Sequence, residues 1–177
     1  MRFVSIAAAI ALNVASTAAL AHGDTDAMRT SEKAAAQLSE QKEFGKPGDP
    51  KKIRRTIRIK MDDSMHFAPE KLDVMQGDTV RIVVTNAGKL MHELVIGTMR
   101  ELKEHAELMR RFPGMKHEEP YMVHVPAGKT GNIVWHFNKP GEFNFACLVA
   151  GHMEAGMLGK IVVANAAPEK ARAPVRK

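Results

Sequence analysis

The chain has 177 residues, with 26 Lys and Arg against 20 Asp and Glu, and a formal net charge of +6. This length suits one domain with a modest core, and the single cysteine excludes an internal disulfide. The basic balance suits an acidic redox partner or an anionic surface. No stretch is typical of nucleic-acid binding, so we expect no nucleic-acid partner.

The N-terminal stretch 1–21 is predicted to be a cleaved signal peptide. Arg2 supplies the positive start, residues 3–12 form an apolar core, and Ala19-Leu20-Ala21 is a small-x-small cleavage site. Polar residues interrupt the apolar run, so we expect no stable membrane insertion. The mature chain would then begin at His22, in the periplasm.

Residues 22–50 carry little patterned hydrophobicity and are predicted to form a flexible N-terminal segment. A short Ala-rich helix could form over residues 31–42, but the run Gly45-Lys46-Pro47-Gly48-Asp49-Pro50 should break any structure. We interpret this segment as a tether.

A domain over residues 51–164 is predicted from the change to a period of two after Lys51. Short runs rich in β-branched and aromatic residues, separated by Gly and Pro turns, predict strands. These runs cover residues 53–61, 71–75, 79–85, 92–96, 121–125, 130–137, 143–147 and 160–163. Only residues 98–112 have a helical period, with Met99, Leu102, Ala106 and Met109 on one side. The pattern favours an all-β sandwich or barrel with one inserted helix. The Ala-, Pro- and Lys/Arg-rich residues 165–177 are predicted to be a disordered basic tail.

One stretch concentrates metal-binding side chains. Cys147 is followed five positions later by His152, and Met157 comes five positions after that. A thiolate, an imidazole and a thioether are three of the four ligands of a type-1 copper site, which has two His and one Cys with a weak axial Met. The second imidazole is best supplied by His92, which shares a strand face with Leu94 and Ile96. The alternatives are a buried, inert cysteine and a core histidine with a satisfied hydrogen bond.

This stretch resembles the copper loop of the cupredoxins, the small blue copper proteins. The spacing from Cys147 to His152 and on to Met157 is similar to that of auracyanin and rusticyanin, and Gly156-Met157-Leu158-Gly159-Lys160-Ile161-Val162-Val163 is similar to the family's closing strand. The resemblance covers roughly residues 51–164. It implies a Greek-key β-sandwich that holds one type-1 copper at one end, with His92, Cys147, His152 and Met157 as metal ligands.

The same resemblance implies a carrier of single electrons that cycles between Cu(II) and Cu(I). A redox partner would dock near His152, on an apolar collar of Leu148, Val149, Ala150, Met153 and Ala155. The carrier would be a monomer. We do not expect an enzyme, since Ala146 and Leu148 flank Cys147 where multicopper oxidases have histidines. One position departs from the family, because Glu93 stands where Asn or Ser often follows the first ligand histidine.

A copper-tolerance role on the same fold is the alternative. The chain has 12 methionines against one Trp and one Tyr, and thioethers and imidazoles favour Cu(I) and Cu(II) respectively. Methionine and histidine lie close together in four places: Met65-His66, Met91-His92, Met115 with His117, and Met122 with His124, this last pair on an outward face. An N-terminal His22 could also chelate Cu(II) through its amine and imidazole, although it could simply follow a cleavage site. These residues suggest additional, weaker copper sites, although most methionines could instead be core filler. A metal-free structural sandwich is the third hypothesis.

Overall fold

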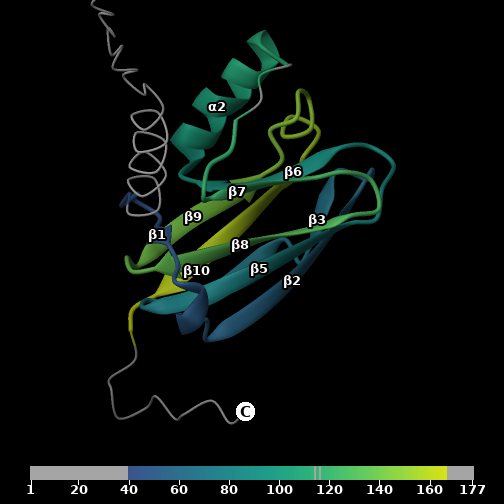
Figure 1. The fold of residues 1–177 in the computed structure, drawn as a ribbon. Helices are drawn as coiled ribbons and strands as arrows, with labels where there is room; N and C mark the ends of the chain where they lie inside the picture. The colour runs from purple at the N-terminus through teal and green to yellow at the C-terminus, as the bar shows by residue number, and fades with distance from the viewer. Residues whose placement is uncertain (1–39, 114, 116, 167–177) are drawn as a thin grey trace, which may run out of the picture.

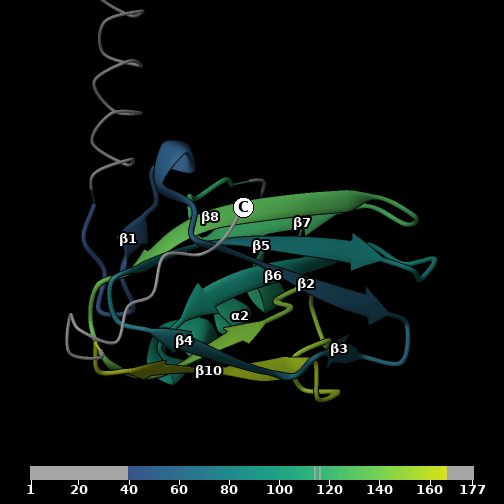
Figure 2. The same ribbon diagram turned by 90° about the horizontal axis from the view of Figure 1, so that it is seen from below.

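A computed structural model describes residues 40–113, 115 and 117–166, and in this part of the chain two five-stranded sheets pack face to face (Figures 1 and 2). In sheet order, the first sheet contains β1 (Lys46–Pro47), β8 (Thr130–Phe137), β5 (Asp78–Asn86), β2 (Arg55–Asp62) and β3 (His66–Ala68). The second contains β4 (Lys71–Met75), β10 (Leu158–Ala164), β9 (Gly141–Ala146), β6 (His92–Gly97) and β7 (Met122–Val125). The predicted all-β sandwich with one inserted helix is confirmed. No helix in the described part of the chain is long and apolar enough to cross a membrane.

Alternating side chains place the core between the two sheets. In β2, Ile57, Ile59 and Met61 point inward and are buried, while the residues between them are exposed. β5 pairs with β2 in parallel and with β8 in the antiparallel sense. Aromatic rings fill the centre of the sandwich, including Phe67 and Phe145, whose ring centroids are 5.0 Å apart in an edge-on arrangement. Burying one such side chain stabilises a fold by about 1.5–3 kcal/mol.

The helix α2 (Met99–Arg111) covers the outer face of the second sheet, against β6 and β9 (Figure 1). It begins with a capping box, in which Thr98 accepts from the backbone N–H of Glu101 and Glu101 accepts from that of Thr98. Leu102, Ala106 and Met109 are its buried residues. The other face of β6 packs in the main core, so with α2 over its outer face all six residues of the strand are buried.

This cover corrects one expectation about β7. The face that carries Met122 and His124 was predicted to point outward, but Met122 is only 7% exposed and packs in the same cluster as Leu102 and Met109. Met122 is therefore core filler, because the inserted helix turns an outer sheet face into a second, smaller core.

Residues 40–50 also differ from the prediction of a flexible segment. Phe44 is 2% exposed, and its ring stacks on that of Trp135 with centroids 5.4 Å apart. The indole N–H of Trp135 donates to the Phe44 carbonyl oxygen over 2.9 Å, and Lys46–Pro47 pairs with the edge of β8. One large aromatic residue inserted into the core thus holds a segment that turn-forming residues predicted to be loose. The predicted signal peptide, residues 22–39 and most of the predicted tail lie outside the described residues.

Candidate metal centre

Three predicted ligands meet at one end of the sandwich. His92 begins β6, Cys147 directly follows β9, and His152 lies in the loop between β9 and β10. The Cys147 Sγ atom is 3.3 Å from His152 Nδ1 and 4.0 Å from His92 Nδ1. One ligand atom from each residue lies within 4.8 Å of the others. The structure therefore brings His92 to Cys147, 55 positions later in the sequence, and to His152, five positions beyond Cys147.

His92 is oriented by a carboxylate that the sequence analysis missed. Its Nε2 lies 3.1 Å from Asp63 Oδ1, and because an ionised carboxylate only accepts hydrogen bonds, Nε2 carries the proton and Nδ1 presents its lone pair to Cys147. Asp63 also accepts from the backbone N–H groups of Lys89 and Leu90. These backbone hydrogen bonds, followed by the one from His92, lower the pKa of Asp63. Nothing in the local sequence marks this residue, since the contact spans 29 positions.

Cys147 is fully buried, and burial raises the pKa of its thiol to about 12. The backbone N–H of Glu93 donates to the sulfur over 3.4 Å and opposes this shift. Without a cation beside it the sulfur remains a thiol, so a bound metal must displace a proton from it.

His152 and Met157 are held by hydrogen bonds within one compact loop. Cys147 N–H donates to the Met157 carbonyl over 3.1 Å, and Met157 N–H donates to the His152 carbonyl over 3.0 Å. Gly151 and Gly156 have positive φ angles of 87° and 104°, which glycine adopts without strain. Burial, and then the nearby His92 ring, lower the pKa of His152.

Met157 is fully buried in the main core cluster together with Cys147. The structure thus places the fourth predicted ligand inside the domain, next in the chain to the closing strand. Its role as a weak axial ligand remains a prediction.

Glu93 ties the two ligand-bearing segments together. It is only 1% exposed, and both of its carboxylate oxygens have partners. Its Oε1 accepts from the Leu148 N–H over 3.0 Å, and its Oε2 lies 2.8 Å from His124 Nδ1. Burial raises the pKa of Glu93, and the His124 ring and the Leu148 hydrogen bond oppose that rise. Glu93 is thus a carboxylate that links β6 to both β7 and the loop that follows β9.

The surface around His152 differs in part from the predicted apolar collar. Leu148 is buried under α2 with 1% exposure, so it belongs to the smaller core. Leu90 and Met91, which precede His92, are instead 48% and 46% exposed. The apolar side chains at this end therefore come from both ligand-bearing segments.

The donor set fits copper. A cysteine sulfur and two imidazoles so close together suit a type-1 copper ion, and the buried methionine suits its weak axial position. His92, Cys147 and His152 could hold a copper ion.

Comparisons with known proteins agree with this chemistry. The model of the plastocyanin/azurin family of copper-binding proteins matches residues 54–164. The copper-resistant cuproprotein CopI of Rubrivivax gelatinosus is 52% identical over 120 residues, which cover 68% of this chain and 73% of that protein. The copper-resistant cuproprotein CopI of Vibrio cholerae is 32% identical over 159 residues, covering 86% of this chain and 94% of that protein.

Solved structures of low sequence identity share the fold. The auracyanin of Roseiflexus castenholzii has a TM-score of 0.55 at 19% identity, covering 63% of this chain and 98% of that one. An azurin from Methylomonas sp. strain J has a TM-score of 0.52 at 12% identity, covering 62% of this chain and 98% of that one. With the family model matching most of the chain and three of the predicted ligands meeting at one end of the sandwich, the chain belongs to the plastocyanin/azurin family of copper-binding proteins, the cupredoxins.

Proposed function

We propose that this protein is a periplasmic copper-tolerance cupredoxin that binds copper through His92, Cys147, His152 and Met157. The observation that carries the proposal is the convergence of one buried sulfur and two imidazole nitrogens within 4.8 Å. The similarity to two copper-resistant cuproproteins favours tolerance as the role. A bound copper supplies a one-electron Cu(II)/Cu(I) couple.

The residues around the site have separate tasks in this proposal. Asp63 holds the His92 ring so that Nδ1 faces the metal position. The Glu93 N–H group stabilises negative charge on the Cys147 sulfur once its proton has left. His152 is half-buried, so it lies between the metal position and solvent. It can therefore provide a route for an electron to reach the site.

The tolerance role can be tested by measuring how copper affects growth of the organism with and without this gene. A strain that lacks the gene should grow poorly at elevated copper and recover with the intact gene, whereas the Cys147→Ser gene should not restore growth. Purified protein should develop a visible thiolate-to-copper absorption on addition of Cu(II), and Cys147→Ser should not. Normal growth of the deletion strain at all copper levels would refute the tolerance role. A colourless protein with Cys147 intact and copper bound would refute the site.

Single-electron carrying is the second candidate, and a specific observation favours it. Leu90 and Met91 are exposed directly before His92, close to the half-buried His152 loop. An exposed apolar rim suits brief docking of a redox partner. A respiratory or photosynthetic defect in the deletion strain at low copper would support this function, and copper sensitivity alone would count against it.

A further inference from the structure

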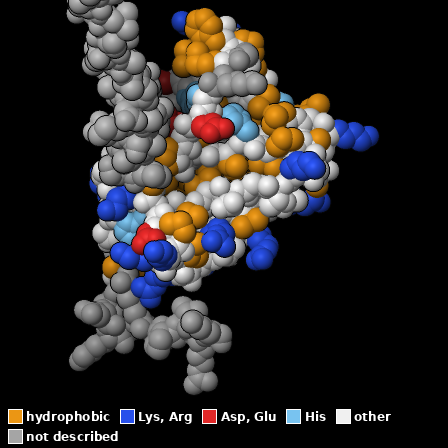
Figure 3. Space-filling model, in the orientation of Figure 1, with side chains coloured by type: hydrophobic (Ala, Val, Ile, Leu, Met, Phe, Trp, Pro, Cys, Tyr) orange, Lys and Arg blue, Asp and Glu red, His pale blue; other side chains and the backbone are white. Residues whose placement is uncertain are grey.

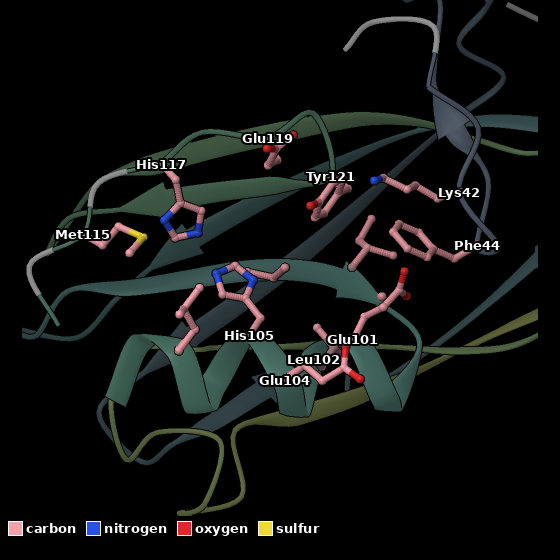
Figure 4. A pocket seen from close by; sticks show the side chains of 14 residues that line it. Lys42, Phe44, Glu101, Leu102, Glu104, His105, Met115, His117, Glu119 and Tyr121 are labelled. Atoms are coloured by element: carbon pink, nitrogen blue, oxygen red, sulfur yellow. The ribbon is translucent and has the colours of Figure 1, made fainter. Parts of the chain in front are cut away.

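The region where α2 faces the segment after it holds histidines that the copper loop does not use. Of the four Met/His pairs in the sequence, Met122 is core filler, and His66 is exposed with its Nδ1 bonded to the Ser64 carbonyl. Met115 is different, because it is 42% exposed and lines a pocket with His117 and His105. Figure 4 shows these three side chains beside one another in the pocket.

His117 has an unusual environment. Both of its ring nitrogens are buried, and neither has a hydrogen-bond partner among the described residues. A buried nitrogen without a partner costs about 1–3 kcal/mol, so a ring that only filled space would be replaced at a gain by an apolar side chain. An imidazole whose nitrogen lone pair has no hydrogen-bond partner is suited to bind a metal ion through that lone pair.

The ring of His105 faces this unpartnered ring. Their centroids are 4.6 Å apart, and the planes are tilted by 55°. His105 projects from α2, whereas His117 lies on the segment that leads to β7, so the helix and the segment each supply one imidazole. No functional reason for His105 was visible in the sequence, where it is one polar position on a helix.

The neighbouring His124 is already engaged and serves as a support. Its Nδ1 lies 2.8 Å from Glu93 Oε2, and its Nε2 donates to the His117 carbonyl oxygen over 3.1 Å. The chain of contacts from Glu93 through His124 therefore fixes the backbone at residue 117. The other side of Glu93 is bonded to the Leu148 N–H group beside Cys147.

We propose that His105, His117 and the Met115 thioether form a second copper site that binds Cu(I). Imidazole nitrogens bind copper, and the soft, neutral thioether shifts the preference of the site toward Cu(I). A harder divalent ion would require a third nitrogen or oxygen ligand. Among the described residues, His92, Cys147 and His152 are the only group of three His, Cys, Asp or Glu residues close enough to share an ion, so the pocket beside α2 lacks such a third ligand.

The pocket gives an ion access to this site. It has a volume of about 480 Å³, and Glu101, Glu104 and Glu119 line it together with Lys42. Three carboxylates against one ammonium group make the pocket attractive to a cation. Figure 3 shows hydrophobic side chains gathered at the end of the molecule where α2 lies, which agrees with the exposure of Leu108 and Phe112. The choice of copper rests on the proposed tolerance function; the geometry of the site does not.

The experiment is an anaerobic titration of the full-length protein with Cu(I) in ascorbate, in competition with the Cu(I) chelator bicinchoninate. The first equivalent should fill the copper loop and the second should fill the new site. We expect His105→Leu and Met115→Leu each to weaken binding of the second equivalent at least tenfold. The variant His66→Gln, which changes an exposed histidine outside this pocket, is the control and should leave it unchanged.

A local measurement accompanies the titration. Nitrogen-15 spectra of the imidazoles should show the rings of His105 and His117 shifting with the second equivalent of Cu(I). Because Met115 is 42% exposed, its replacement by leucine keeps the fold and tests the thioether alone. Unchanged affinity in both variants, or an equal loss in the control, would overturn the proposal. Normal Cu(II) colour without a second equivalent would refute the second site alone, whereas absent colour would refute the proposed function.

Discussion

Replacement of Glu93 should damage stability and metal binding together. Glu93→Ala removes the acceptor for the buried Leu148 N–H group and the partner of His124 Nδ1. An unsatisfied buried N–H costs about 1–3 kcal/mol. The pair with His124 adds less than a fully buried pair would, because the His124 side chain is 34% exposed. We therefore expect the free energy of unfolding to fall by about 2–4 kcal/mol in total.

Glu93→Gln separates the hydrogen bonds from the charge. A glutamine oxygen can still accept from the Leu148 N–H group, so this variant should lose only about 1 kcal/mol. Urea unfolding of the metal-free protein, followed by circular dichroism, measures both variants. The visible spectrum after addition of Cu(II) reports on the site, and we expect a changed absorption in Glu93→Ala. Stability of Glu93→Ala within about 0.5 kcal/mol of the original protein would refute the reasoning, because substitutions without a structural role lie in that range.

Three further predictions concern the site and the N-terminal segment. Asp63→Ala should weaken Cu(II) binding by about 10–100-fold in a chelator competition because the His92 ring loses its orienting acceptor, and Asp63→Asn, which keeps an acceptor, should lose less. Since burial raises the pKa of the Cys147 thiol to about 12, copper displaces one proton from it, and the apparent Cu(II) affinity should rise about tenfold per pH unit between about pH 7 and 9. The lowered pKa of His152 keeps that ring neutral over this range, so a flat profile would contradict the assignment of the sulfur. Phe44→Ala should reduce the free energy of unfolding by about 3–5 kcal/mol in urea, and a loss below about 1 kcal/mol would show that residues 40–50 are not held by this ring.

The fold class could be predicted because strands with one buried face leave a period of two in the sequence. β2 shows this clearly, with Ile57, Ile59 and Met61 buried between exposed residues. The strand β7 was also predicted, but the burial of its outer face was not, because α2 covers that face and the burial of Met122 depends on that contact. The packing of residues 40–50 was missed for a similar reason, since it depends on Phe44 reaching Trp135, 91 positions away.

The site was predictable to the extent that its chemistry is local in the sequence. Cys147 and His152 lie in one loop, and His92 has the phase of a residue that points into the domain. Glu93 was noted in the sequence as an unusual neighbour of His92, but its partners were not predictable, and Asp63 and His124 were not identified as supporting residues. Asp63, Glu93 and His124 act through contacts between distant segments, and an acidic or basic residue in a turn or strand gives no sign of such a contact.

The short strand β1 has a consequence for association between molecules. β8 would otherwise end the first sheet with a row of unpaired backbone groups, which can recruit a strand from another copy. Lys46–Pro47 covers part of that row, and Pro47 has no N–H group to offer to a further strand. A sheet margin that is partly blocked in this way offers fewer backbone groups to a strand of a second molecule.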